Sequence, residues 1–401
     1  MSEYDIKNLE ELLASHLHRE IVDKKITRLT APGENYGSLM LKVDLTVKNG
    51  DRTEEIHAAA KCVPPNEAIQ KMFNTQVTFR NEIAWYTIII PTIQRFLREN
   101  NVRFSANFFT ELYGARISLN KDSATVDEDG VILFENLTKS GYRNDDRHIG
   151  FDLSTAREVL KAFAVFHAVP AAMRLKQPEL FDNNIRPHLH TVEFFNKEEF
   201  PLSLGFLKFL ETDAVVKHLA EKVKTAIDRC KPFGTDDVQD IWGTTTHNDS
   251  WINNIMVRDK SEPKVKIVDL QAVSLGSPAA DLVFCLITSV NTAVLEKHFD
   301  ELIQFYYDQF IYVIKEVGVD YQQFPYDSFA RELNAHGPAQ FAHCVNFLCG
   351  ILADKGDTQN DPVKKDYNLE EHMKALGEIF TERHQERFRF LIKEFARRNW
   401  I

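Results

Sequence analysis

The clearest pattern in the first third of the chain is an alternation of apolar and polar side chains. Apolar residues occupy every second position from 39 to 47, namely Leu39, Leu41, Val43, Leu45 and Val47. Because successive side chains of a strand point to opposite faces, this period of two predicts a strand with one apolar face. The pair Asn49-Gly50 then predicts a tight turn into a second strand over residues 56–63.

Similar signals predict a small antiparallel sheet with one helix inserted in it. Further strands are expected over residues 21–29, 108–113 and 131–134, with the last two forming a second hairpin. Near-helical spacing of apolar residues predicts helices over 5–18 and 66–90, and Pro91 is expected to disrupt the second of them.

The rest of the chain has mostly helical spacing. Helices are expected over 153–168, 206–229, 291–316, 325–350 and 369–398, and a hairpin over 255–269 interrupts them. We therefore predict an α+β fold with two lobes that share a cleft. The first lobe, residues 1–135, would hold the antiparallel sheet, and the larger lobe, residues 136–401, would be mainly helical.

Composition narrows the class of protein and its partners. The formal net charge is −11, which repels phosphate backbones and anionic lipids, so we expect neither nucleic acid nor a membrane surface as a partner. The five cysteines form no C-x-x-C pair, which argues against a structural zinc site or a disulfide framework and favours a cytoplasmic protein. The charged first residues predict no signal peptide, and nothing in the pattern indicates an oligomeric state.

The strongest candidate chemistry lies between His247 and Gln271. Asp249 is followed five residues later by Asn254, and Asp269 stands at the end of the predicted hairpin. A hairpin would make Asn254 and Asp269 cross-strand neighbours, and one oxygen ligand from each suits Mg²⁺, which takes few protein ligands and shares phosphate oxygens. Protein kinases use an Asp, an Asn and a later Asp in this order as base and metal ligands.

Each of these polar residues taken alone is better explained as a turn or capping residue. Their joint spacing around an apolar hairpin favours phosphoryl transfer instead. His247 is expected to orient the loop through hydrogen bonds, and Asp281 to cap a helix or brace that loop. His167, on an apolar helix, is expected to be a buried histidine with its hydrogen bonds satisfied.

A candidate phosphate-binding lysine lies in the predicted sheet. Lys61 shares one face of its strand with Ala59, which leaves room for an adenine ring beside the lysine. Glu82, on the helix that follows, could pair with Lys61 and hold it towards the phosphates. The alternatives are a solvated charge at a strand edge for Lys61 and a solvated helix face for Glu82.

Two loops complete the predicted nucleotide site. Gly33, Gly37 and Ser38 lie between two strands, where backbone N–H groups could approach phosphates, although a plain hairpin turn explains them as well. Glu135, Asn136 and Leu137 connect the sheet-rich and helical parts, which is where a two-lobed kinase presents backbone groups to adenine.

Taken together, these segments resemble the ecdysteroid-kinase-like proteins of insects, which are related to choline and aminoglycoside kinases. The resemblance is ordered along roughly 33–290. It is carried by G-E-N-Y-G-S (33–38), A-A-A-K (58–61), F-R-N-E-I-A-W-Y (79–86), F-E-N-L (134–137), F-H-A (166–168), H-N-D-S-W-I-N-N (247–254) and V-D-L-Q (268–271).

The resemblance implies a bilobal protein-kinase-like fold and ATP-dependent phosphorylation of a hydroxyl on a small molecule, with steroid alcohols as the named substrates. Carried over by position, Asp249 would be the catalytic base, and Asn254 and Asp269 would bind Mg²⁺. Lys61 would hold the phosphates of ATP and pair with Glu82. Residues 135–137 would form the adenine hinge.

Two positions depart from the family pattern. Asn248 stands where the family usually has Gly, and Leu270 where it usually has Phe. Because Asn tolerates a positive φ better than most residues, the backbone shape could survive. These departures keep a second hypothesis open, a retired kinase-like protein that binds a nucleotide or a lipophilic ligand without turnover. A kinase acting on proteins is disfavoured, since no activation-loop or A-P-E-type segment follows Asp269.

Overall fold

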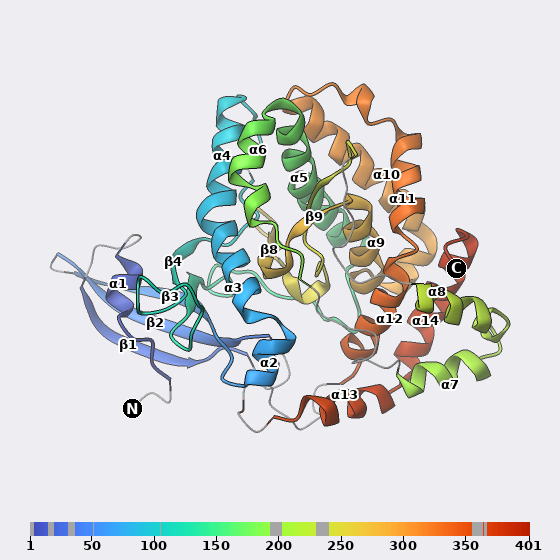
Figure 1. The fold of residues 1–401 in the computed structure, drawn as a ribbon, viewed down its shortest axis with the longest axis horizontal. Coiled ribbons are helices and arrows are strands. Elements are labelled where there is room, and N and C mark those ends of the chain that lie inside the picture. Colours follow the sequence, from blue (N-terminus) through green and yellow to red (C-terminus); the bar gives the residue numbers. More distant parts are fainter. Residues whose placement is uncertain are drawn as a thin grey trace.

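The chain folds into a sheet-rich lobe and a larger helical lobe (Figure 1). The computed structural model describes residues 4–14, 20–30, 37–50, 52–104, 106–192, 203–229, 240–354, 364 and 367–401. The five-stranded antiparallel sheet has the order β1-β2-β3-β5-β4. Its strands are β1 (Ile21–Arg28), β2 (Leu39–Asn49), β3 (Arg52–Cys62), β4 (Leu112–Arg116) and β5 (Val131–Glu135).

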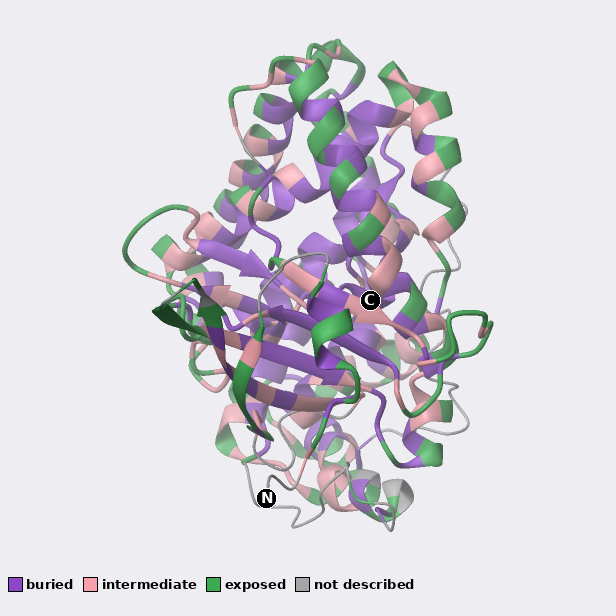
Figure 2. Ribbon diagram, turned by 90° about the vertical axis from the view of Figure 1, so that its left-hand side faces the viewer, coloured by how far each residue is buried: buried purple, intermediate pink, exposed green. Residues whose placement is uncertain are grey.

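The alternation in β2 sets the two faces of this sheet. Its buried residues from Leu41 to Val47 pack with the short helix α1 (Leu9–Leu13) on the outer face. On β3, Ala58 and Ala60 share that face, so Ala59 and Lys61 point to the opposite face, towards the helical lobe. Figure 2 shows the resulting mixture of buried and partly buried positions along these strands.

The helix after β3 is longer than the sequence pattern predicts. It begins with α2 (Glu67–Met72), breaks at Asn74, and continues as α3 (Thr75–Ala84), a π-helical turn (Trp85–Ile89) and α4 (Ile90–Glu99). Pro91 does not end the helix, but the α-helical hydrogen-bond pattern is interrupted just before it. Pro91 lies in the first turn of α4, directly after the π-helical turn, and the chain stays helical through both.

The helical lobe is built around α5 (Leu153–Lys176), which packs along α10 (Thr292–Glu316). The predicted helices are present, but three of them are divided. The segment 206–229 becomes α7 (Leu204–Thr212) and α8 (Ala220–Arg229), 325–350 becomes α11 (Tyr326–His336) and α12 (Gln340–Ile351), and 369–398 becomes α13 (Leu369–Glu378) and α14 (Glu382–Arg397). The remaining α-helices are α6 (Pro178–Asn184) and α9 (Pro278–Ser289).

Local chemistry explains these divisions. Pro338 follows the end of α11 and cannot donate the backbone hydrogen bond that a continuous helix would require. Thr381 starts α14 with a capping box that it shares with His384. The side chain of Asp213 accepts hydrogen bonds from the backbone N–H groups of Val215 and Val216, which favours a turn after α7.

Four short strands inside the helical lobe carry the candidate site. Strands β6 (Thr244–Thr246) and β9 (Ser274–Gly276) pair, and β7 (Ile255–Val257) and β8 (Val265–Ile267) form the predicted hairpin. The strand expected over 108–113 is displaced. Phe109 bridges to Ile267 of β8, and pairing with β5 begins only at Leu112. Within the described residues, no helix is both long and apolar enough to cross a membrane.

Candidate active site

Lys61 is the centre of a buried ionic cluster between the two lobes. Its Nζ lies 2.5 Å from Oε2 of Glu82 on α3 and 2.7 Å from Oδ1 of Asp269, which follows β8. The side chains of Lys61 and Glu82 are only 6% and 2% exposed. This excludes the alternative that each is a solvated charge on the surface. Burial alone lowers the pKa of Lys61, but the charges of Asp269 and Glu82 outweigh it and raise the pKa.

Gln271 also belongs to this cluster, although no role was predicted for it. Its Oε1 accepts a hydrogen bond of 3.1 Å from Lys61 Nζ, and its backbone oxygen accepts one of 3.3 Å from Asn81 on α3. Glu82 is tied to the same segment because its Oε1 accepts the backbone N–H of Leu270. The only sequence signal for Gln271 was its position two residues after Asp269.

The loop that carries Asp249 is held by a buried polar network. Oδ2 and Oδ1 of Asp281 accept the backbone N–H groups of His247 and Asn248 at 2.5 and 2.9 Å. His167 bonds Asp281 through Nε2 at 3.1 Å and the hydroxyl of Tyr306 through Nδ1 at 2.6 Å. Asp281 therefore braces the loop, and His167 is a buried histidine with both ring nitrogens satisfied, as predicted.

His247 orients the same loop from the other side. Its Nε2 lies 3.0 Å from the backbone oxygen of Val268, and its Nδ1 accepts the backbone N–H of Asp249 at 3.3 Å. Burial lowers the pKa of His247, which favours the neutral ring. These contacts are those expected of a residue that orients the loop through hydrogen bonds.

Asn248 adopts the left-handed backbone conformation that its position requires, with φ of 63°. Its side-chain Nδ2 donates to the backbone oxygen of Ala272 at 2.8 Å and to Oγ of Ser274 at 2.9 Å. The departure from Gly therefore preserves the backbone shape and adds hydrogen bonds to the segment after Asp269.

Asp249 has one satisfied and one unsatisfied carboxylate oxygen. Nδ2 of Asn254 donates to Oδ2 of Asp249 at 2.8 Å and to its backbone oxygen at 2.9 Å. Oδ1 is buried and has no hydrogen-bond partner among the described residues. Burial, and then repulsion by Asp269, raise the pKa of Asp249 well above its ordinary value. A carboxylate in this state is a strong acceptor for an incoming proton.

The chemistry of Asn254 and Asp269 fits a magnesium ion. Asn254 ends the short turn before β7, and its backbone oxygen accepts the N–H of Val268 at 3.0 Å, which brings it beside Asp269 across the hairpin. Because Asn254 uses its Nδ2 to hold Asp249, its amide oxygen remains for a ligand. The described residues contain no cluster of three His, Cys, Asp or Glu that could hold a metal, whereas Mg²⁺ needs only one or two such side chains beside phosphate oxygens.

A cavity of about 1200 Å³ is lined by residues from both lobes. Lys61, Glu82, Asp249, Asn254 and Asp269 all line it. The sheet contributes an apolar wall made of Met40, Ala59 and Phe134. The predicted hinge residues Glu135 and Leu137 line it as well, and so does Gly37.

One described residue of the predicted glycine loop, Ser38, does not line this cavity. Ser38 is 3% exposed and does not line the cavity, whereas its neighbour Gly37 does. Its predicted contact with phosphates is therefore not supported. Gly33 lies outside the described residues.

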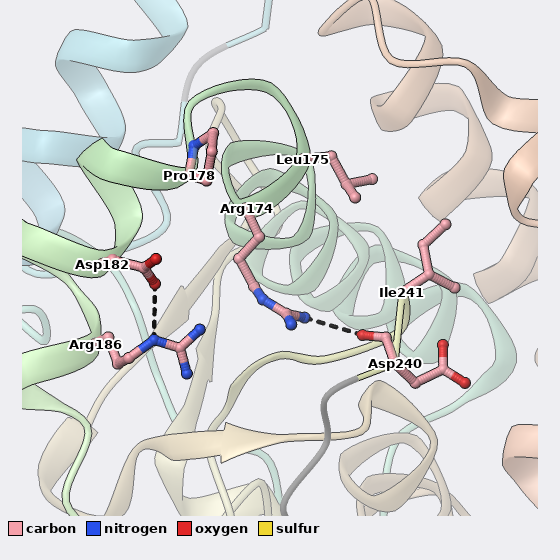
Figure 3. Close-up of a pocket in the computed structure, with 7 residues that line it drawn as sticks. All are labelled: Arg174, Leu175, Pro178, Asp182, Arg186, Asp240 and Ile241. Atoms are coloured by element: carbon pink, nitrogen blue, oxygen red, sulfur yellow. Dashed lines mark hydrogen bonds and ion pairs between the residues drawn. The ribbon is translucent and has the colours of Figure 1, made fainter.

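A second, smaller cavity of about 310 Å³ lies between the ends of α5 and α6 (Figure 3). Its two arginines are already engaged, Arg174 with the backbone oxygen of Asp240 and Arg186 with the carboxylate of Asp182. None of the predicted site residues lines this cavity, so the candidate chemistry belongs to the larger one.

The ecdysteroid kinase-like family matches residues 32–319, which is well over half of the chain and includes every residue of the ionic cluster. The chain belongs to the ecdysteroid kinase-like family. The bilobal α+β architecture of this member is the kinase-like fold that the sequence predicted. A search of curated proteins gives no match.

Solved structures give distant likenesses. Choline kinase from Cryptosporidium parvum is 10% identical with a TM-score of 0.44, covering 99% of this chain and 94% of that one. Plasmodium vivax ethanolamine kinase is 12% identical with a TM-score of 0.36, covering 82% and 77%. An aminoglycoside phosphotransferase from Streptomyces rimosus in complex with ADP and streptomycin is 11% identical with a TM-score of 0.29, covering 82% and 93%.

Proposed function

We propose that this ecdysteroid kinase-like protein uses ATP and Mg²⁺ to phosphorylate a hydroxyl group of a small molecule, with a steroid alcohol as the preferred acceptor. The observation that carries the proposal is the unsatisfied Oδ1 of Asp249, buried in the same cavity as the Lys61–Glu82–Asp269 cluster. A general base needs an unoccupied lone pair within reach of the reacting hydroxyl, and a phosphate site needs a positioned cation.

In this proposal, each side chain of the site has a separate role. Oδ1 of Asp249 accepts the hydroxyl proton of the acceptor while the acceptor oxygen forms a bond to the γ-phosphorus of ATP. The bond between that phosphorus and the β–γ bridging oxygen breaks, and ADP leaves with the electron pair. Lys61 binds the phosphates, and Glu82 keeps its ammonium group in place.

Asn254 and Asp269 would hold Mg²⁺, which supplies positive charge that offsets the phosphate charge. Asn254 has a second task, because its Nδ2 fixes the rotamer of Asp249 and leaves Oδ1 for the acceptor. The left-handed backbone of Asp269, with φ of 61°, turns its carboxylate towards Lys61 immediately after β8.

The test is a transfer assay with matched variants. Purified protein is incubated with Mg·ATP and a panel of hydroxyl compounds that includes steroid alcohols, choline and an aminoglycoside. ADP release and the mass of a phosphorylated product are measured. Asp249→Ala is expected to lower turnover by about 10²- to 10⁴-fold with nucleotide affinity retained, whereas Asp269→Ala is expected to weaken Mg·ATP binding itself.

The control is Asp259→Ala, which removes an exposed carboxylate in the turn of the same hairpin, 81% exposed, and should change neither property. Wild-type turnover in Asp249→Ala would refute the assignment of the base. Tight nucleotide binding with no transfer to any acceptor would favour the alternative, a retired kinase. Asn248 keeps the loop shape, and the bond to Glu82 at position 270 comes from the backbone N–H and is independent of the side chain there, so active turnover is the expected result.

A further inference from the structure

Lys266 is a second buried lysine, outside the ionic cluster and not predicted to have a role. It lies on β8 opposite Met256 of β7, and only 9% of it is exposed. Met256 lines the large cavity, so Lys266 stands immediately beside the cavity wall. A buried ammonium group is costly unless partners satisfy it, which means that its contacts are informative.

The partners of Lys266 come from both lobes. Its Nζ donates to the backbone oxygen of Phe109 at 2.5 Å and lies 3.4 Å from Oε1 of Glu135, the last residue of β5. It also lies 5.9 Å from the ring centre of Tyr142. Burial lowers the pKa of Lys266, and the charge of Glu135 opposes that shift.

The carboxylate of Glu135 is in turn fixed on both oxygens. Oε1 accepts the backbone N–H of Glu111 at 3.2 Å, and Oε2 accepts the hydroxyl of Ser140 at 3.2 Å. The side chain of this hinge residue is therefore occupied with structural contacts. By contrast, the backbone N–H of Leu137 donates to no other described residue, so the hinge keeps a backbone donor at the cavity wall.

The segment from Phe108 to Arg116 crosses between the lobes at the same place. The backbone oxygen of Phe108 accepts the N–H of Ile267 on β8, at 2.8 Å. A few residues later the chain joins the sheet as β4, and the backbone oxygen of Glu111 accepts the N–H of Glu135 at 3.0 Å. Lys266 therefore lies where the hinge, the crossing segment and β8 meet, three residues before Asp269.

We infer that Lys266 is a positioning residue that keeps the hinge at a fixed distance from Asp269, so that the adenine and the phosphates of one nucleotide can be bound at the same time. The inference rests on the proposed nucleotide site. The adenine would contact the hinge, and the phosphates would contact Lys61 and Asp269. If the hinge moved relative to β8, only one end of the nucleotide could remain well placed.

The experiment compares a ligand that contains adenine with one that contains only the phosphates. Lys266→Met removes the charge and keeps most of the side-chain length. Dissociation constants for Mg·ATP and for Mg·tripolyphosphate are measured by calorimetry. Affinity for Mg·ATP is expected to fall roughly 10-fold, and affinity for Mg·tripolyphosphate to change less than about 2-fold, because tripolyphosphate contacts only the Lys61 end of the site. Lys264→Met, 41% exposed just before the same strand, is the matched control and should change neither.

The outcomes separate the inference from the proposed function. Equal weakening of both ligands would show a merely structural role and overturn the inference, and so would unchanged affinity for Mg·ATP. A wild-type protein that binds neither ligand would instead refute the nucleotide site itself. If Lys266→Met does not fold, the double variant Lys266→Met with Glu135→Gln removes both buried charges, and the same selective loss for Mg·ATP is expected of it.

Discussion

Replacing Lys61 by Met should destabilise the protein far more than the loss of one surface ion pair would. The change removes three contacts of the ammonium group, with Glu82, Asp269 and Gln271. It leaves the Glu82 carboxylate, 2% exposed, with only the backbone N–H of Leu270 as a donor among the described residues. An uncompensated buried charge is the main cost of breaking such a pair.

The size of the effect follows from these exposures. Removing one partner of a buried ion pair costs about 3–5 kcal/mol, and the pair with Glu82 is buried on both sides. Asp269 is 26% exposed, so water partly satisfies it once the lysine is gone. Glu82→Gln should cost less than Lys61→Met, because Lys61 keeps Asp269 and Gln271 as partners. The double variant should recover part of the loss, with a coupling free energy of about 2 kcal/mol.

The assay is urea-induced unfolding of the wild type, both single variants and the double variant. Tryptophan fluorescence follows the transition, and the free energies of unfolding form a double-mutant cycle. Lys24→Met, which removes an exposed ion pair with Asp5, is the control and should change stability by less than about 1 kcal/mol. A coupling near zero, or a cost for Lys61→Met no larger than for the control, would refute the view that this cluster is a buried ionic unit.

Two further predictions concern the catalytic loop. Asp249→Asn should stabilise the protein by about 1 kcal/mol at neutral pH, because the raised pKa of Asp249 means that its charged form is disfavoured in the folded state. Because the folded-state pKa of Asp249 is raised, this residue contributes its full stability to the wild type below pH 3.8, and that contribution is lost as the pH rises. The stability advantage of Asp249→Asn over the wild type should therefore shrink from pH 8 towards pH 5. Thermal unfolding of both proteins across this range measures the difference, and a pH-independent difference would contradict the prediction. Asn248→Ala should be less stable than Asn248→Gly by about 1 kcal/mol in urea unfolding, because φ is 63° and Ala disfavours that conformation. The reverse order would show that side-chain contacts outweigh backbone strain.

Patterns local to the chain predicted strands β1, β2, β3 and β5, the β7–β8 hairpin and most of the polar residues of the candidate site, whereas the strand expected over 108–113 was displaced. The strand signal in β2 and the turn signal of Asn49-Gly50 each depend only on residues that are neighbours in the chain. The spacing of Asp249 and Asn254 is local in the same sense, because both lie in one loop. These features are local, so their signal is complete within a few residues.

The packing of the two lobes sets which residues meet across long stretches of sequence. Glu82 was as consistent with a solvated helix face as with a buried ion pair, because helical spacing does not say which neighbour a face meets. Gln271, Lys266 and the bracing contact of Asp281 depend on packing between segments that are far apart in the chain. A buried charge is stable only where several elements supply partners at once, and that condition exists only after the lobes have packed.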